Sequence, residues 1–163
     1  MKKKDHLPVF GIGPVCIYLM AGLLLAGLYL DYRGIIDGGK TETFALPMRI
    51  MGVLLIAAGI FMWIMAVAID KIGDKIVKNH LLVTGMYAYV RNPVYSAFAI
   101  ALTGVCLLTA NLVLLVLPVL FWLDITLLMK FTEEKWLSEL YGKEYEEYCR
   151  TVNRCIPWFP KEK

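Results

Sequence analysis

Residues 9–30 form an apolar run without a single charged side chain. A helix rises about 1.5 Å per residue, so this run is long enough to cross a hydrocarbon core of about 30 Å. Residues 51–69 form a second such run. Residues 94–129 contain one charged side chain, Asp124, and are too many for one span. This third run divides best at residues 109–111, which predicts two helices in a tight hairpin.

These runs predict an all-α, multi-pass transmembrane bundle of four spans. Hydrophobic residues make up 59% of the 163 residues, well above the balance of a soluble domain. No linker or repeat divides the chain, so we expect residues 1–163 to form a single integral membrane domain. Residues 1–70 would supply two spans whose role is packing. Small residues allow close helix contact, and these spans contain Gly22, Gly27, Gly52 and Gly59.

The distribution of basic residues predicts the orientation of the spans. The connector at residues 31–47 holds Arg33 and Lys40, with Arg49 at the edge of the next span. The other side holds many more basic residues, namely Lys2, Lys3, Lys4, Lys71, Lys75, Lys78, Arg91 and the seven that follow residue 129. The positive-inside rule therefore places both termini and the connector at residues 70–93 in the cytoplasm. The net charge of +3 reflects this topology, and we expect no nucleic-acid partner.

The cysteines and histidines predict neither disulfides nor a metal site. Cys16 and Cys106 lie in predicted spans, and Cys149 and Cys155 lie in the cytoplasmic tail, where the compartment is reducing. No CxxC pair occurs, and the chain has two histidines, His6 and His80. We therefore expect no bound metal.

Beyond residue 132 the apolar side chains recur at helical spacing, with charged residues between them. The stripe consists of Trp136, Leu137, Leu140 and Tyr141, then Tyr145, Tyr148, Cys149 and Val152. This pattern predicts a cytoplasmic amphipathic helix, which Gly142 can interrupt. One interpretation is a helix lying on the bilayer interface, with Tyr and Trp as an aromatic belt.

Polar and aromatic residues crowd the start of the third span. Pro93 suits a first helical turn, where its missing N–H costs nothing. The free N–H groups of that turn can bind an anionic group, and the tyrosines between Tyr87 and Tyr95 lie beside them. Two interpretations remain open at this point: a ligand site, or an interfacial anchor made of Tyr and Arg.

Three acidic residues allow both structural and functional interpretations. Glu133 and Glu134 can be exposed acids at a helix start, or supply a partner for Lys130 at i,i+3 spacing. Asp124 lies inside a span, so we expect it to face protein or water rather than lipid, and to bond Arg91 or a tyrosine hydroxyl. The roles of Asp124 and Lys130 are not determined by the sequence.

The motifs taken together resemble the isoprenylcysteine carboxyl methyltransferase family, whose relatives include the phospholipid N-methyltransferases. The resemblance covers residues 79–157, in matching order and spacing. It rests on Leu82-Val83-Thr84-Gly85-Met86-Tyr87, Arg91-Asn92-Pro93-Val94-Tyr95, Glu133-Glu134-x-x-Leu137 and Tyr141-Gly142-x-x-Tyr145.

The resemblance implies that S-adenosylmethionine binds in a cytoplasmic pocket without a Rossmann domain. The pocket would lie between the motif before the third span and the helix after the fourth. A sulfonium gains from aromatic faces and a carboxylate, and the cofactor's own carboxylate gains from free N–H groups. Carried over by position, the cofactor-binding residues are Asn79, His80, Leu81, Leu82, Tyr87, Asn92, Pro93, Val94, Tyr95 and Glu133.

The sequence departs from the family pattern at three positions. Met86 replaces a common proline, Asn92 stands where many members have histidine, and Met129 stands where the prenylcysteine enzymes present an arginine to the substrate carboxylate. The methyl acceptor implied is therefore a carboxylate or an amine of a lipophilic or lipidated substrate. No catalytic residue is assigned, although Tyr95, Glu133 and Asp124 could accept a proton from an amine.

Two functions of other classes compete with a methyltransferase. A four-span transporter of hydrophobic cations would depend on an acid in the membrane, and Asp124 alone would have to serve. A non-catalytic membrane scaffold would bind a partner through its tail, and would have no need of Asn92, Tyr95 and Glu133 at these positions.

Overall fold

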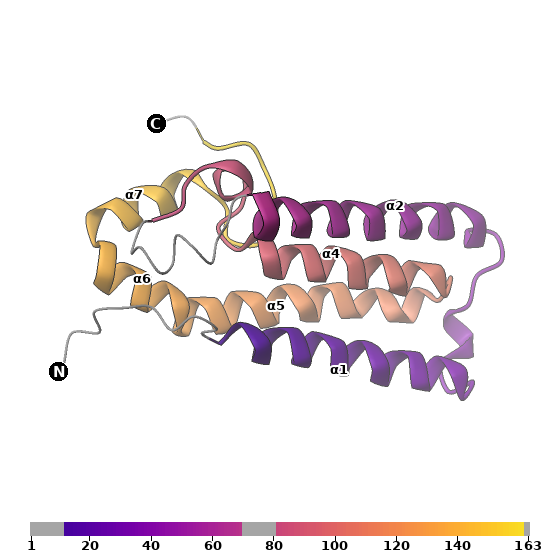
Figure 1. Ribbon diagram of the computed structural model, residues 1–163. Coiled ribbons are helices and arrows are strands. Elements are labelled where there is room, and N and C mark those ends of the chain that lie inside the picture. Colours follow the sequence, from indigo (N-terminus) through magenta and orange to yellow (C-terminus); the bar gives the residue numbers. More distant parts are fainter. Residues whose placement is uncertain (1–11, 70–80, 162–163) are drawn as a thin grey trace.

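The computed structural model describes residues 12–69 and 81–161, and in these residues every regular element is a helix. This confirms the predicted all-α class. Figure 1 labels the longer helices, and the order of elements is α1 (Gly13–Tyr32), η1 (Asp37–Gly39), α2 (Ala45–Ile64), η2 (Met65–Ile69), η3 (Gly85–Ala88), α4 (Pro93–Leu108), η4 (Leu112–Leu115), α5 (Val116–Phe131), α6 (Glu133–Tyr141) and α7 (Lys143–Thr151).

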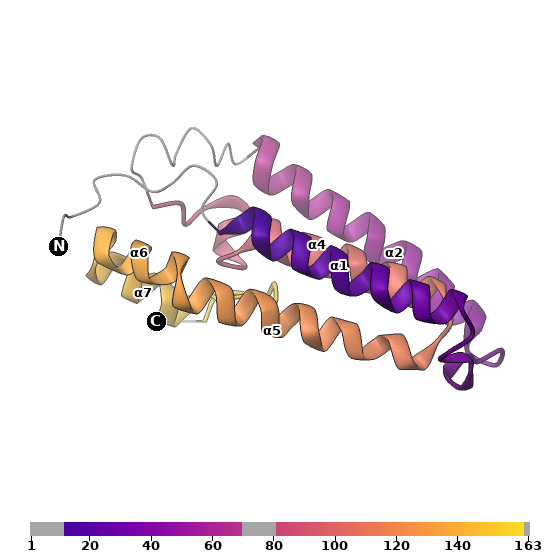
Figure 2. The same ribbon diagram turned by 90° about the horizontal axis from the view of Figure 1, so that it is seen from below.

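Three of these stretches are long and apolar enough to cross a membrane. They are Gly13–Tyr32, Ala45–Ile69 and Leu112–Tyr141, whereas Pro93–Leu108 is a shorter apolar helix. The four long helices run lengthwise beside one another (Figures 1 and 2), and α4 contacts α1, α2 and α5. The shortest of the four apolar stretches, Pro93–Leu108, is therefore the central one.

The core lies among α1, α4 and α5. Its buried side chains include Met20, Cys106, Phe121, Ile125 and Met129. Many large hydrophobic side chains of α1, α2 and α5 instead point outward and are exposed, for example Tyr18, Phe61 and Leu127. An apolar exterior of this extent is expected where helices face lipid.

Glycines allow α2 and α4 to approach each other closely. A Cβ atom at Gly52 would lie 2.7 Å from the backbone oxygen of Gly104, and one at Gly104 would lie 2.5 Å from that of Gly52. Gly59 is similarly close to Ala97. The expected packing role holds for Gly52 and Gly59, but not for Gly22, which has nothing within 4 Å.

Asn111 fixes the end of the bundle where α4 turns into α5. Its Nδ2 donates to Asp31 Oδ1 at 2.7 Å and to the Ile36 carbonyl at 3.0 Å, and its Oδ1 accepts from the Val113 N–H at 3.0 Å. Ala110 precedes it in the left-handed region, at φ 54°. The chain therefore breaks within residues 109–111, where the sequence predicted it would.

One boundary differs from the expectation. The helix α2 begins at Ala45 rather than at residue 51, because Arg49 lies exposed within its first turns and does not interrupt it. Such a long side chain can keep its charge in water while its stem covers apolar surface. In the tail, Gly142 at φ 55° separates α6 from α7, at the position where the sequence allowed an interruption.

Substituting Gly104 by Ala should destabilise the bundle, because the new methyl group would meet the α2 backbone. We expect a loss of about 1–3 kcal/mol in the free energy of unfolding, which is typical of overpacking. Thermal denaturation in detergent micelles measures this change. Gly22→Ala is the matched control and should be neutral or stabilising, because alanine favours a helix by about 1 kcal/mol. Equal effects of the two substitutions would contradict the packing described.

Candidate functional site

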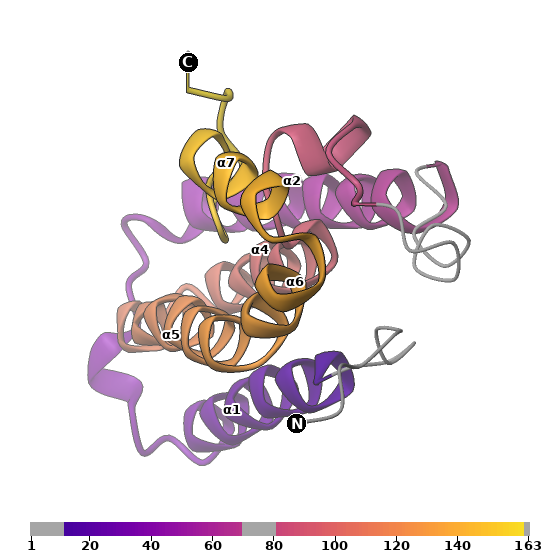
Figure 3. The ribbon, with the colours of Figure 1, turned by 90° about the vertical axis from the view of Figure 1, so that its left-hand side faces the viewer.

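The elements that carry the sequence motifs gather at one end of the bundle. Figure 3 views this end, where α1 and α4 begin and where α6 and α7 lie in front of the bundle. The helix α5 ends at Phe131, and α6 begins at Glu133 in a new direction after Thr132. This change of direction brings the two adjacent glutamates over the start of α4.

Glu134 joins two arginines from distant parts of the chain. Its carboxylate accepts two hydrogen bonds from Arg154, from Nε at 2.6 Å and from a terminal nitrogen at 2.8 Å. Arg91 Nη1 lies 3.1 Å from the same carboxylate and also contacts Cys149. The side chains of Arg91 and Glu134 are only 8% and 12% exposed. Hydrogen bonding to Glu134 raises the pKa of Arg154.

The segment that follows α7 runs along the loop before α4. The N–H of Arg91 donates to the Asn153 carbonyl at 2.9 Å, and Asn92 Nδ2 donates to the Arg154 carbonyl at 3.1 Å. The N–H of Trp158 donates to the Tyr89 carbonyl at 3.1 Å. The C-terminal segment therefore supports the Arg91-Asn92-Pro93 motif through the backbone.

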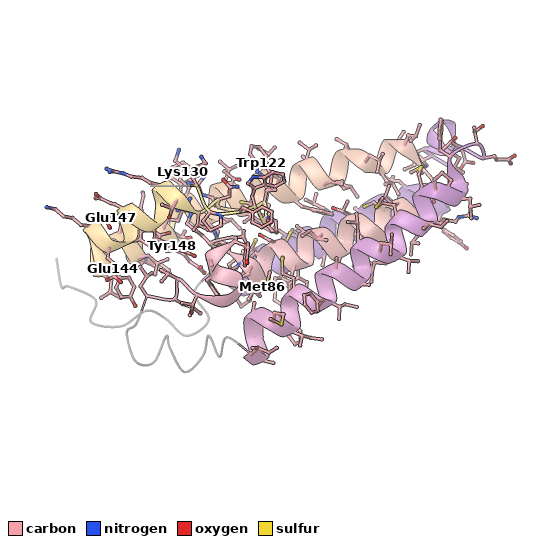
Figure 4. The ribbon with its side chains drawn as sticks, turned by 90° about the horizontal axis from the view of Figure 1, so that it is seen from above. Met86, Trp122, Lys130, Glu144, Glu147 and Tyr148 are labelled. Atoms are coloured by element: carbon pink, nitrogen blue, oxygen red, sulfur yellow. The ribbon has the colours of Figure 1, made fainter. Side chains whose placement is uncertain are left out.

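A second contact holds α7 against the same loop. The Tyr148 hydroxyl donates to the Tyr87 carbonyl at 2.6 Å, and Figure 4 shows Tyr148 on the side of α7 that faces the bundle. Burial raises the pKa of Tyr148, so its hydroxyl keeps the proton that it donates. Around it Tyr145 and Val152 are buried, with Leu81 and Leu137 packed against them.

Tyr95 and Glu133 meet at the junction of three helices. The Tyr95 hydroxyl, in the first turn of α4, donates to Glu133 Oε1 at 3.0 Å. The backbone of Ile12, just before α1, also hydrogen-bonds Glu133. A side chain on Gly13 would overlap the Tyr95 hydroxyl, so glycine leaves room for this contact.

The structure brings most of the predicted site residues to this end of the bundle. Leu82 and Tyr87 are buried against Ala66, with Val94 packed beside them. Pro93 is fully buried in the first turn of α4. Leu81 belongs instead to the cluster around Tyr148. The predicted residues Asn79 and His80 lie outside the described residues.

Asn92 occupies the N-cap position of α4 without capping it. Asparagine is a preferred N-cap residue because its oxygen accepts a hydrogen bond from the first turn. Here its side chain makes no capping bond and points its amide to Arg154. The first-turn N–H groups of α4 therefore remain uncapped by this side chain.

The expected partner of Asp124 was wrong. Asp124 accepts a hydrogen bond from Cys16 Sγ at 3.2 Å, across the contact between α1 and α5. Arg91 pairs with Glu134 instead. Asp124 lies seven residues before the end of α5, about 10 Å along the helix axis, so it is too deep to reach the loop that holds Arg91.

The interpretations of Glu133 and Glu134 as exposed acids, or as a partner of Lys130, are also wrong. The Lys130 ammonium lies over the Phe131 ring, 5.8 Å from its centroid, while both glutamates contact residues of the site. Sequence reasoning missed Arg154, whose segment at residues 152–161 has no helical period. The available signal was compositional: Arg91 and Arg154 lie in the same half of the chain as the adjacent acids Glu133 and Glu134.

Among the described residues, no group of three or more His, Cys, Asp or Glu could hold a metal ion. The chemistry at this end of the bundle comes from one hydrogen-bonded carboxylate, tyrosines, uncapped backbone N–H groups and a charged triad. This set of groups suits an organic ligand that has both cationic and anionic parts.

Comparison with known families supports the same end of the chain. The model of a family described as phospholipid methyltransferase matches residues 47–144, which is more than half of the chain. The chain belongs to the phospholipid methyltransferase family. The matched residues include α2, the loop before α4, the hydrogen-bonded Tyr95 and Glu133, and the first residues of α7. The resemblance found in the sequence is confirmed.

Two curated relatives of the family match parts of the chain. A protein-S-isoprenylcysteine O-methyltransferase of Schizosaccharomyces pombe is 38% identical over 91 residues, which are 55% of this chain and 38% of the relative. A methanethiol S-methyltransferase of Bradyrhizobium diazoefficiens is 30% identical over 73 residues, 45% of this chain and 25% of the relative. The chain thus spans well under half the length of each. No solved structure matches it significantly.

Family membership and the long apolar helices together identify an integral membrane protein. In this family member, the motif residues of α4 and α6 are in direct contact at one end of the bundle.

Replacing Glu134 by Ala should strongly destabilise this end of the protein. The change leaves Arg91 buried without its partner, and breaking a buried ion pair costs about 3–5 kcal/mol. Chemical denaturation in micelles measures the loss. Glu139→Ala is the control on the same helix, where the side chain is exposed and the change should be within about 0.5 kcal/mol. If Glu134→Ala lowered the free energy of unfolding no more than Glu139→Ala, the ion pairs of Glu134 would not stabilise the packing of the tail.

Proposed function

We propose that this protein is an S-adenosylmethionine-dependent methyltransferase that acts on a carboxylate or an amine of a lipophilic substrate at the cytoplasmic membrane face. The family match and the names of the two relatives support the reaction class. The observation that carries the proposal is the hydrogen bond between Tyr95 and Glu133, because it joins two of the four motifs on which the family resemblance rests.

The groups at this end of the bundle fit the proposed cofactor. The uncapped first turn of α4 offers backbone N–H groups to a carboxylate. Glu133 can accept hydrogen bonds from a ribose diol, and Tyr87 and Tyr95 offer aromatic faces to a cation. The proposed cofactor-binding residues are Asn79, His80, Leu81, Leu82, Tyr87, Asn92, Pro93, Val94, Tyr95 and Glu133. When bound, the cofactor would supply an electrophilic methyl group on a sulfonium.

The chain's own contribution would be alignment and the exclusion of water. Tyr95 and Glu133 restrain each other, and Gly13 lets the start of α1 close against them. Holding two reactants in line can contribute up to about 7–11 kcal/mol to a lower barrier. A carboxylate acceptor needs no general base, whereas an amine must lose a proton. The Glu133 carboxylate, which accepts a hydrogen bond from Tyr95, would take up that proton.

The proposed function requires a particular placement in the membrane. We propose four spans, with α4 and α5 as a hairpin and with both termini in the cytoplasm. The site end of the bundle would then face the cytoplasm, and α6 and α7 would cover it as amphipathic helices. The exposed apolar faces of α1, α2 and α5 would contact the lipid bilayer. Lipophilic substrates would enter the site sideways from the bilayer.

S-adenosylhomocysteine should stabilise the purified protein against heat. A ligand at 100 times its dissociation constant adds about 2.7 kcal/mol to the free energy of unfolding. The shift in melting temperature should shrink for Glu133→Gln, which removes the negative charge from the site, and for Tyr95→Phe, which removes the hydroxyl that bonds Glu133. Tyr18→Phe, at an exposed position on α1, is the control and should keep the full shift.

Absence of any shift in the wild-type protein would contradict the proposal. It would favour a four-span transporter of hydrophobic cations or a non-catalytic scaffold. Proton-driven efflux from vesicles that Asp124→Asn abolishes would identify the transporter, because Asp124 is a charged residue well inside a membrane helix.

Incubation of membranes with S-adenosylmethionine labelled at the methyl group should label a lipid-soluble product. A label that mild base releases indicates a methyl ester, and hence a carboxylate acceptor. A base-stable label indicates an amine. Labelling confined to water-soluble products would contradict a lipophilic substrate, and Glu133→Ala membranes serve as the control for background.

A further inference from the structure

Three aromatic side chains form an exposed cluster where the C-terminal segment meets the loop before α4. Trp158 is 65% exposed, Phe159 is 73% exposed and Tyr89 is 42% exposed. The ring centroids of Tyr89 and Phe159 are 6.1 Å apart, and those of Trp158 and Phe159 are 6.4 Å apart, both edge to face. We call these three residues the aromatic strap. A contiguous exposed patch of this kind marks an interaction surface.

The backbone holds the aromatic strap in place. The N–H of Trp158 bonds the Tyr89 carbonyl at 3.1 Å, and the N–H of Lys161 bonds the Thr151 carbonyl at 2.9 Å. Pro157 and Pro160 flank the two rings and restrict the backbone between these bonds. The rings are therefore exposed by a fixed conformation, and fraying of the chain does not explain their exposure.

The aromatic strap lies at the end of the bundle where the apolar helices end. In Figure 1 the C-terminal segment lies at about the level of that end, and in Figure 3 it extends away from the bundle. The loop that carries Tyr89 packs on η2 through Leu82 and Tyr87. The last turns of the apolar stretch that ends with η2 expose Trp63, Ile64 and Ile69. The strap is therefore held at the level where the apolar surface of the bundle ends.

The charges around the aromatic strap suit an anionic lipid surface. Lys161 is exposed directly after the rings. Two exposed acids of α7, Glu144 and Glu147, lie in Figure 4 at the outer part of that helix, farther from the bundle than Tyr148. A basic residue beside the headgroups is favourable, and carboxylates pointing away from them avoid repulsion.

We propose that the aromatic strap inserts into the headgroup region of the bilayer and anchors the loop before α4 at the membrane surface. Tyr and Trp favour this level because their rings have an apolar body and a polar edge. Asn153 and Arg154 belong to the same segment and bond the loop at Arg91 and Asn92. The anchor would therefore hold this loop where lipid begins, and the advantage for a lipophilic methyl acceptor rests on the proposed function.

Fluorescence quenching by brominated lipids tests the anchor without any assay of activity. Trp63, Trp122 and Trp136 are replaced by Phe, which leaves Trp158 as the one tryptophan. The protein is reconstituted in vesicles of phosphatidylcholine and an anionic phospholipid that contain lipid brominated either near the headgroup or near the chain end. A matched variant keeps Trp122 alone, an exposed residue about 14 Å along α5 from the end of that helix.

We expect Trp158 to be quenched more strongly by the shallow bromine than by the deep one, with emission shifted to the blue relative to tryptophan in water. Trp122 should show the reverse order of quenching. Emission from Trp158 that is quenched by aqueous acrylamide and unaffected by either lipid would overturn the anchor. Trp158 emission that neither acrylamide nor the brominated lipids quench would also overturn the anchor, and would indicate that a protein partner covers the strap. The quenching of Trp158 does not depend on methyl transfer, so the anchor can hold even if the proposed function is wrong.

Discussion

The ion cluster of Glu134, Arg91 and Arg154 is the constraint on which the rest of this end of the protein depends. One carboxylate bonds two guanidinium groups that are 63 residues apart in the chain, and little solvent reaches Arg91 or Glu134. Such a group adds little net stability over an apolar core, but it strongly penalises any arrangement that separates the charges. It therefore selects one position for α6, α7 and the C-terminal segment.

That selection determines where the neighbouring carboxylate points. Glu133 and Glu134 are adjacent in the first turn of α6, yet they contact different partners. Because Glu134 is fixed to the arginines, Glu133 is held against Tyr95 at the start of α4. The contact brings together the two motifs of the family, and the uncapped amides of α4 lie in the same turn as Tyr95. The ion cluster and the proposed cofactor site therefore both depend on the position of the first turn of α6.

The sequence was most informative where a pattern is long. Uncharged runs predicted the long helices, and the break at residues 109–111 was found because two polar residues flank Ala110 there. The sequence placed the start of α2 after Arg49, because counting charges does not show whether a charged side chain of a helix can extend to water. The position of Glu133 followed from the family resemblance, whereas Arg154 was missed because its segment is irregular. The partner of Asp124 was wrong because depth along a helix depends on tertiary placement.

The most direct test of the central claim is an experimental structure of the protein determined with S-adenosylhomocysteine in a lipid environment. The account predicts ligand density against Tyr95 and Glu133, with the amino-acid part of the ligand toward the first turn of α4 and the Glu134 triad intact. Ligand bound elsewhere, or Tyr95 and Glu133 far apart with acyl chains between them, would contradict it.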